Sequence, residues 1–363
     1  MARKLNFYPG PSALPAEALK AVQEELLEWD GTGMSVMEIS HRSKEYDQLH
    51  NHTKALLKKL YQIPDDFEVV LLQGGASLQF AMVPMNILEE NQSADYIVTG
   101  RFSKNAYKAG VSINKNVRLA CSTEEDGKYL RIPSQQELEL SSDAVYCHLT
   151  SNNTVAGTQW HEFPDTGSVP IVADMSSDIF SRKIDFSSIG LIYAGAQKNL
   201  GPAGVTVAII RKDLIEQSKQ GLPDILSYAT LASKNSLYNT PPCFGIYVMN
   251  KVLSWAKNKG GLDFIENQNR QKADMVYSLI DQNPEFFKTG VEKNSRSMMN
   301  VTFRLPTEEL ESKFLSEAQD QGIIGLKGHR SVGGVRISMY NANGVKEVGT
   351  LIDFIKDFMK KNG

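Results

Sequence analysis

The chain has 363 residues, of which 41% are hydrophobic and 22% are charged, so it holds enough apolar material for a large core. This length exceeds the roughly 250–300 residues at which one core stops growing, and it predicts two domains. The formal net charge of −3 argues against sequence-independent nucleic-acid binding, which needs a broad basic surface. No apolar run approaches the roughly 18 residues of a membrane span, and the amino terminus lacks a signal-peptide pattern, so we expect a cytoplasmic protein.

The first two thirds of the chain alternate helical patterns with short apolar runs. An apolar series with helical spacing, entered through Pro15, predicts the first helix: Leu19, Val22, Leu26 and Trp29. A second helix is expected at residues 44–60. Several later runs are solidly apolar, which is typical of strands that are covered on both faces. The expected strands lie at residues 68–72, 96–99, 144–149, 169–173, 191–193 and 205–210.

The last third of the chain has a different pattern. A long helix is expected at residues 244–257, before Gly260 and Gly261, and the domain boundary is placed at this glycine pair. Beyond the pair, the pattern predicts a long helix, strands at residues 299–303 and 334–339, a helix from Thr307 and a final helix. The predicted class is α/β, with a mostly parallel sheet in a large domain and a smaller carboxy-terminal α+β domain. The large domain is assigned to residues 16–259, and the small domain to residues 260–363 together with 1–15.

Lys198 is the first candidate for chemistry, because motifs for nicotinamide, nucleotide or zinc-protease sites do not occur in this sequence. It lies in the segment Gly-Ala-Gln-Lys-Asn at residues 195–199, just after a predicted buried strand. Apolar surroundings lower the pKa of an amine and free it for Schiff-base chemistry. A single loop lysine is more often solvated, so this interpretation depends on partners.

Asp174 and a glycine-rich turn supply those partners. Asp174 follows the strand predicted at residues 169–173, at the edge where open α/β sheets hold ligands, and could keep a pyridine nitrogen protonated. The segment Gln-Gly-Gly-Ala-Ser at residues 73–77 leads from a strand into a helix, whose exposed amides suit a phosphate. Each feature alone has a structural explanation, a helix cap or a packing turn. Together, an amine, a pyridinium partner and a phosphate cradle predict pyridoxal phosphate as the cofactor.

With these residues in view, the sequence resembles the phosphoserine aminotransferase family, in class V of the fold type I pyridoxal-phosphate enzymes, over nearly its whole length. The segments that carry the resemblance are residues 6–11, 37–43, 73–77, 195–199, 239–242 and 328–330. The resemblance implies a homodimeric aminotransferase with shared active sites, which moves an amino group between glutamate and 3-phosphohydroxypyruvate to give 2-oxoglutarate and phosphoserine. This is a step of serine biosynthesis, and the family also acts on phosphohydroxythreonine in pyridoxine biosynthesis.

The resemblance also implies a role for individual residues. Lys198 would form the Schiff base with the cofactor and act as the general base, while Asp174 would pair with the pyridinium nitrogen. The cofactor would alternate between its aldehyde and amine forms in a ping-pong cycle. The other cofactor contacts would be Ala76, Ser77, Gln197, Phe102 and Thr154, joined by Asn239 and Thr240 from the other subunit.

The expected substrates share an α-carboxylate and carry a second anion on a short arm. Arg336 is expected to bind the α-carboxylate through a bidentate pair. Each candidate substrate-binding side chain alone could form an ordinary ion pair or structural hydrogen bond. The two His-Arg dipeptides, at residues 41–42 and 329–330, favour an anion site. Many family members have tryptophan at Phe102, and some have arginine at Ser77. The distal phosphate must then depend on His41, Arg42, His329 and Arg330.

Three alternatives stay open at this point: a cysteine desulfurase, an alanine–glyoxylate aminotransferase and a non-catalytic scaffold. A desulfurase needs a mobile cysteine, and only Cys243 lies in a context that suggests exposure, whereas Cys121 and Cys147 lie in apolar runs. The three cysteines also fit neither a disulfide framework nor a metal site, so no metal is expected. An enzyme for uncharged side chains would not need two His-Arg pairs. A scaffold would have lost Lys198 or Asp174, and both are present.

Overall fold

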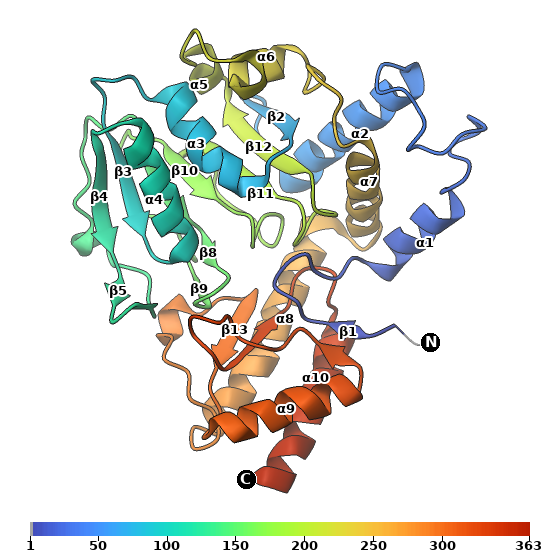
Figure 1. Ribbon diagram of the computed structural model, residues 1–363, viewed down its shortest axis with the longest axis vertical. Helices are drawn as coiled ribbons and strands as arrows, with labels where there is room; N and C mark the ends of the chain where they lie inside the picture. Colours follow the sequence, from blue (N-terminus) through green and yellow to red (C-terminus); the bar gives the residue numbers. More distant parts are fainter. Residues whose placement is uncertain (1–2) are drawn as a thin grey trace.

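The computed structural model describes residues 3–363, so Met1 and Ala2, which the domain prediction included, lie outside the described residues (Figure 1). A seven-stranded sheet forms its centre, and its strands lie in the order β2 (Phe67–Leu72), β12 (Thr206–Arg211), β11 (Ile189–Gly195), β10 (Ile171–Asp174), β7 (Cys147–Thr150), β3 (Ala94–Val98) and β4 (Val117–Ser122). All neighbouring strands are parallel except at β12, which runs antiparallel to β11 and β2. The predicted α/β class with a mostly parallel sheet is confirmed.

Helices cover both faces of this sheet, which explains why its strands, apart from the edge strand β4, are almost continuously buried. One face packs against α3 (Gly75–Ile87), α4 (Arg101–Ile113), α5 (Lys212–Glu216) and α6 (Tyr228–Ser233). The other face packs against α2 (Lys44–Tyr61), α7 (Cys243–Asn258) and the start of α8 (Gly261–Gln282). The burial of both faces leaves the ends of the strands as the places where a ligand can reach the sheet.

The carboxy-terminal third forms a separate layered unit, drawn in orange and red in the lower half of Figure 1. Its elements are α8, β13 (Asn300–Phe303) antiparallel to β15 (Val335–Ser338), α9 (Glu308–Asp320) and α10 (Val345–Asn362), with β1 (Leu5–Asn6) parallel to β14 (Ile323–Ile324). These elements enclose a hydrophobic cluster of their own, which also takes in Phe7 from the amino-terminal segment. The division at residues 259 and 260 stays a prediction, supported by this second core.

The remaining elements are short. They comprise the hairpins β5 (Glu124–Glu125) with β6 (Lys128–Tyr129) and β8 (Asn152–Asn153) with β9 (Thr158–Gln159), the helix α1 (Ala16–Glu24), and single 3₁₀ turns at Gln135–Glu137, Asp224–Leu226 and Lys293–Ser295. In residues 3–363, no helix is long and apolar enough to cross a membrane.

The first predicted helix is partly wrong. Helix α1 ends at Glu24, so the apolar series does not continue on one helical face through Trp29. Instead, the chain turns and Trp29 packs edge-on against Tyr247 of α7, with ring centroids 6.2 Å apart. Glu25 fixes this turn because it accepts hydrogen bonds from Tyr247 at 2.8 Å and from Lys251 at 2.7 Å. Tertiary contacts with α7 therefore end the helix where local spacing would extend it.

Candidate active site

A cavity of about 290 Å³ lies where the carboxyl ends of β7, β10 and β11 meet the start of α3 and the small carboxy-terminal unit. This position follows from the parallel arrangement of the three strands, whose following loops must all emerge at one edge. The predicted site residues that line the cavity are Ala76, Ser77, Phe102, Thr154, Asp174, Gln197, Lys198, His329 and Arg336. Side chains that are far apart in the sequence thus meet in one place.

Lys198 reaches into the cavity from the loop that follows β11. Its Nζ donates to Oγ1 of Thr154 at 2.7 Å and lies 5.7 Å from the ring centroid of Phe102. Burial lowers the pKa of Lys198 to about 8, and the nearby carboxylate of Asp174 limits this fall. Gly10 allows the lysine stem to pass, because a Cβ at Gly10 would lie 3.1 Å from Cγ of Lys198. The lysine is therefore held as an amine that loses its proton near neutral pH.

Asp174 is the last residue of β10 and is almost fully buried in the wall of the cavity. Its Oδ1 accepts a hydrogen bond from the backbone amide of Ser176 at 3.0 Å. Burial raises the pKa of this carboxyl, while the hydrogen bonds from Ser176 and the charge of Lys198 oppose the rise. A buried carboxylate of this kind suits a positively charged ring nitrogen, which would replace the solvation that the carboxylate has lost.

The start of α3 provides the anion end of the cavity. Gly74 is the N-cap in the left-handed conformation, with φ of +88°, and no side chain caps the first amides of the helix. Gly75, Ala76 and Ser77 of this first turn line the cavity, as does Gln197. The hydroxyl of Thr150, another lining residue, is buried without a hydrogen-bond partner among the described residues. Uncapped amides, a free hydroxyl, an amine and a buried carboxylate fit pyridoxal phosphate.

Arg336 approaches from β15 of the small carboxy-terminal unit. Its Nη1 donates to the carbonyl of Thr154 at 3.4 Å, and its buried Nε has no partner among the described residues. No carboxylate within residues 3–363 forms an ion pair with Arg336, and burial lowers the pKa of its guanidinium. A buried cation without a counter-ion suits a carboxylate ligand.

Five of the predicted site residues do not line this cavity: His41, Arg42, Arg330, Asn239 and Thr240. Asn239 and Thr240 lie beside the glycine-rich turn, since Nδ2 of Asn239 donates to Gln73 at 3.1 Å and Nε2 of Gln73 donates to the Thr240 carbonyl at 2.9 Å. Nε2 of His41 is buried and has no partner among the described residues. A single copy of the chain therefore does not assemble the whole predicted set.

Some residues of the cavity were missed from the sequence. Asn152 and Ser177 are lining residues, and Nδ2 of Asn152 donates to Ser177 and to Asn300 of β13, both at 2.8 Å. Polar side chains directly after an apolar strand are a signal that could have found Asn152, Ser176 and Ser177. The contact with Asn300 joins the two units, and no local pattern predicts it.

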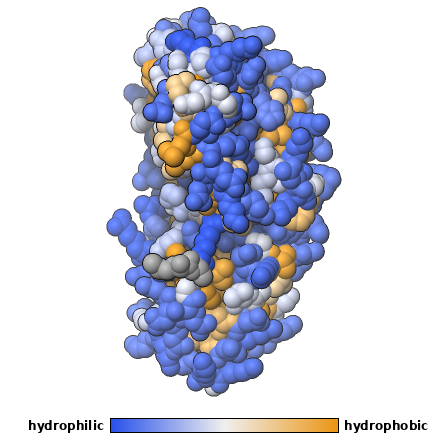
Figure 2. All heavy atoms as spheres, turned by 90° about the vertical axis from the view of Figure 1, so that its right-hand side faces the viewer, coloured by the Kyte–Doolittle hydropathy of each residue, from blue (hydrophilic) through white to orange (hydrophobic). Residues whose placement is uncertain are grey.

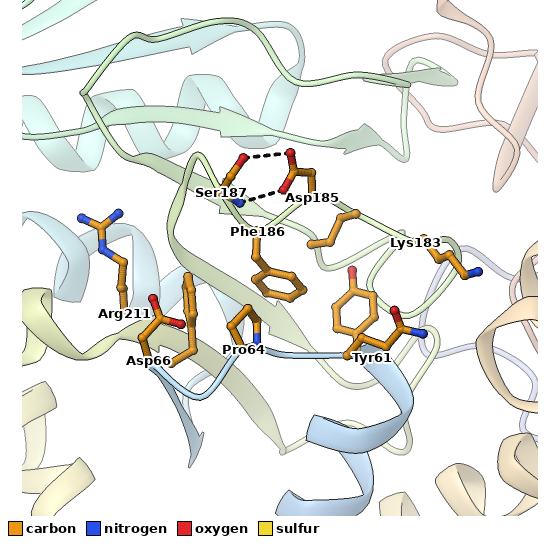
Figure 3. Close-up of a pocket in the computed structure, with 11 residues that line it drawn as sticks. Tyr61, Pro64, Asp66, Lys183, Asp185, Phe186, Ser187 and Arg211 are labelled. Carbon is orange, nitrogen blue, oxygen red and sulfur yellow. Dashed lines mark hydrogen bonds between the residues drawn. The ribbon is translucent and has the colours of Figure 1, made fainter.

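A larger cavity, of about 490 Å³, opens at the opposite edge of the sheet, where β2 and β11 begin (Figure 3). Its cations already have partners, because Arg211 pairs with Asp213 at 2.7 Å and Lys183 pairs with Asp263. Figure 3 also shows Asp185 bonded to Ser187 rather than directed at a ligand. We therefore assign the chemistry to the smaller cavity around Lys198.

Fold and site together define a pyridoxal-phosphate-dependent aminotransferase of class V, and the family model for class-V aminotransferases matches residues 4–351. A phosphoserine aminotransferase of Lysinibacillus sphaericus (strain C3-41) is 51% identical over 360 residues, which cover 99% of both chains. One of Desulfatibacillum aliphaticivorans is 52% identical over 359 residues, covering 99% of this chain and 98% of the relative. The chain belongs to the phosphoserine aminotransferase family within class V.

Solved structures agree with this assignment. The phosphoserine aminotransferase of Bacillus circulans subsp. alkalophilus superimposes with a TM-score of 0.96 at 48% identity, covering 99% of both chains. An alanine–glyoxylate aminotransferase of Nostoc sp. shares the fold alone, with a TM-score of 0.77 at 17% identity. The predicted family, fold, enzyme class and cofactor are confirmed. No cysteine lines the cavity within the described residues, so a desulfurase mechanism has no nucleophile there.

Proposed function

We propose that the chain transfers an amino group reversibly between glutamate and 3-phosphohydroxypyruvate, with 2-oxoglutarate and phosphoserine as the products. The observation that carries this proposal is the pairing, in one cavity, of an amine poised to lose its proton with a buried cation that has no counter-ion among residues 3–363. Lys198 and Asp174 provide the first part, and Arg336 provides the second, with the imidazole of His329 in the same cavity. The substrates are dicarboxylic or phosphorylated, which matches this charge.

The residues divide the work between the cofactor and the substrate. Bound pyridoxal phosphate supplies an electron sink that stabilises negative charge at the substrate Cα. Asp174 would keep the ring nitrogen protonated, and the amides of Ala76 and Ser77 would hold the phosphate. Lys198 would take the proton from Cα as a general base, since its pKa of about 8 lies close to the working pH. Thr154 would hold the amine in reach of that proton.

Substrate orientation would come from the two ends of the cavity. Arg336 would bind the α-carboxylate through its unpartnered Nε and through Nη2, while Nη1 donates to the Thr154 carbonyl, and this fixes Cα in front of the lysine. His329, which lines the cavity, and its neighbour Arg330, which does not, lie in the turn before β15 and would bind the distal anion. One orientation then serves both substrates in turn, because glutamate and phosphoserine place their second anion on a short arm.

We propose further that two copies of the chain share their active sites, so that His41, Arg42, Asn239 and Thr240 act in the cavity of the partner. Support comes from their position outside the cavity of their own chain. The segment before His41 exposes apolar side chains, with Leu27 at 87%, Met37 at 57% and Met34 at 46% exposure. Figure 2 shows apolar patches among the hydrophilic side chains on the side of the molecule that carries this segment. A partner would cover such side chains.

Mixing two inactive variants tests this sharing. Lys198→Ala removes the amine, and Arg42→Gln removes the proposed trans cation, so each homodimer should have low activity. Equal mixing with subunit exchange should restore about a quarter of the parental activity, because half of the dimers would be hybrids with one complete site. A mixture that forms hybrid dimers without regaining activity would contradict the sharing.

Amino-donor preference tests the substrate assignment. With 2-oxoglutarate as acceptor, kcat/KM for phosphoserine should exceed that for alanine by at least about 100-fold, because alanine cannot use the distal cations. A preference for alanine would reject the phosphoserine assignment in favour of a relative that handles uncharged side chains. The same assay with phosphohydroxythreonine tests the second substrate of the family.

A cytoplasmic location stays a prediction from the sequence.

A further inference from the structure

Arginines of this chain fall into two groups. Those that form ion pairs with carboxylates are Arg118, Arg131, Arg182, Arg211, Arg270, Arg296 and Arg304. Within residues 3–363, those without a carboxylate partner are Arg3, Arg42, Arg101, Arg330 and Arg336. Three of these five are already proposed to bind substrate, and Arg3 donates to the Leu14 carbonyl at 2.6 Å. Arg101 is the remaining arginine of this group, and neither an ion pair nor the proposed function accounts for it.

Arg101 lies at the edge of the candidate active site. It is the first residue of α4, directly before Phe102, and its Nη1 lies 3.1 Å from Nε2 of His329. His329 lines the active-site cavity, while Arg101 lines a neighbouring cavity of about 340 Å³, and Val155 lines both. A guanidinium can only donate, so Nε2 of His329 accepts this bond and the imidazole is neutral. No other side-chain bond engages Arg101 within the described residues, so its remaining N–H groups are free.

The surroundings of this contact are positively charged. Burial lowers the pKa of His329, and the charges of Arg101, Arg336 and Arg330 lower it further. Glu124, a carboxylate of the neighbouring cavity, is bonded to Lys104 at 2.6 Å and to Tyr129 at 2.8 Å, so it does not neutralise Arg101. Three guanidinium groups around one imidazole, without a carboxylate among them, form a site that favours an anion of more than one charge.

We propose that Arg101 binds the distal phosphate of the substrate, together with His329 and Arg330. This inference rests on the proposed function and adds a specificity residue to it. A phosphate dianion offers three acceptor oxygens, so it can take bonds from the guanidinium groups of Arg101 and Arg330 at once, while the imidazole of His329 accepts from Arg101 and orients it. The distal carboxylate of glutamate has one charge less and two oxygens. Arg101 therefore discriminates in favour of the phosphorylated substrate.

Arg101→Gln in the holoenzyme tests the proposal. The KM for phosphoserine should rise about 10- to 100-fold, as expected when one charge-assisted bond is lost, with kcat within about twofold of the parent. The KM for glutamate should rise several-fold less, and inhibition by inorganic phosphate should weaken by a factor similar to that for phosphoserine. The matched control is Lys104→Gln, one turn later on α4, whose amine is bonded to Glu124 rather than to His329.

A double-mutant cycle separates direct binding from support of His329. If Arg101 touches the phosphate, Arg101→Gln should still raise the phosphoserine KM in a His329→Asn background. If Arg101→Gln does not raise the KM further in the His329→Asn background, Arg101 acts only through His329 and the proposal is wrong. An unchanged KM in Arg101→Gln alone also overturns it. A parent protein that does not use phosphoserine would instead reject the proposed function, so the two failures can be told apart.

Discussion

The amine of Lys198 donates a 2.7 Å hydrogen bond to the hydroxyl of Thr154, although the two residues follow different strands of the sheet. Thr154 comes from the hairpin after β7, and Lys198 comes from the loop after β11, with β10 and its Asp174 between them. Residues at the carboxyl ends of three neighbouring strands thus set the position and the charge of one amine. The reactivity of that amine is the feature of the site that experiments can reach most directly.

The capture of pyridoxal phosphate by the cofactor-free protein should depend on the proton of Lys198. Only the neutral amine attacks an aldehyde, and burial lowers the pKa of Lys198 to about 8 from its usual 10.5. The capture rate should therefore rise with pH up to about 8 and level off above it, as followed by the growth of the visible cofactor band. A rate that keeps rising to about pH 10 would show an ordinary solvated lysine. Lys198→Arg, which forms no band, provides the blank.

Asp174→Asn should leave a protein that binds the cofactor but transfers amino groups about 10²–10³-fold more slowly. The neutral amide cannot hold the charge of a protonated ring nitrogen, so the electron sink is weakened. The pH midpoint of cofactor capture should also fall below about 8, because the charge of Asp174 raises the pKa of Lys198 in the parent. Single-turnover kinetics and the capture assay measure the two effects. Asp185→Asn, at the opposite edge of the sheet, should change neither.

Phe102→Ala should weaken cofactor binding about three- to tenfold, because the loss of an aromatic face removes a stacking contact of about 0.5–1.5 kcal/mol. Phe102 lines the cavity and faces the amine of Lys198. Phe102→Trp keeps an aromatic face and should bind the cofactor within about twofold of the parent. Equilibrium dialysis of the three proteins measures the dissociation constants. Equal binding by the alanine variant and the parent would remove the stacking role.

Lys272→Met should lower the free energy of unfolding by about 3–5 kcal/mol, although Lys272 does not line the active-site cavity. The amine of this fully buried lysine donates to three carbonyls, those of Met339 at 2.9 Å, Tyr340 at 3.0 Å and Asn343 at 2.7 Å. Its removal leaves three buried acceptors without partners at the turn that follows β15. Urea unfolding measures the change, and Lys356→Met, an exposed site on α10, is the matched control. A loss below about 1 kcal/mol would show that the turn does not depend on the amine.

Much of the fold could be predicted because apolar runs and helical spacing are local properties. Residues 44–60 and 244–257 were predicted as helices and form α2 and α7 to within one residue at each end. Strand β4 was missed, because it lies at the edge of the sheet and carries exposed polar residues that break its apolar run. The antiparallel direction of β12 was also not predicted, since strand direction depends on the path of the connection rather than on the composition of the strand.

The candidate site also has a part that the sequence predicts and a part that it does not. Lys198, Asp174 and the glycine-rich turn could be found because strand ends and a helix start are visible in the sequence. The pairing of Arg101 with His329 could not, because 228 positions separate them and only the packing of the two units brings them together. The position of His41 and Arg42 outside the cavity of their own chain could not be predicted either. The sequence motif identifies them as site residues, but it does not show where they lie in the folded chain.

The visible absorption spectrum of the purified protein, before and after addition of phosphoserine, tests the cofactor and the substrate together. We expect a yellow band from the cofactor bound to Lys198, which phosphoserine bleaches to the amine form of the cofactor with release of one equivalent of 3-phosphohydroxypyruvate. A band that phosphoserine leaves unchanged would keep the cofactor and contradict the substrate assignment. No band, even after incubation with pyridoxal phosphate, would contradict the role of Lys198 itself.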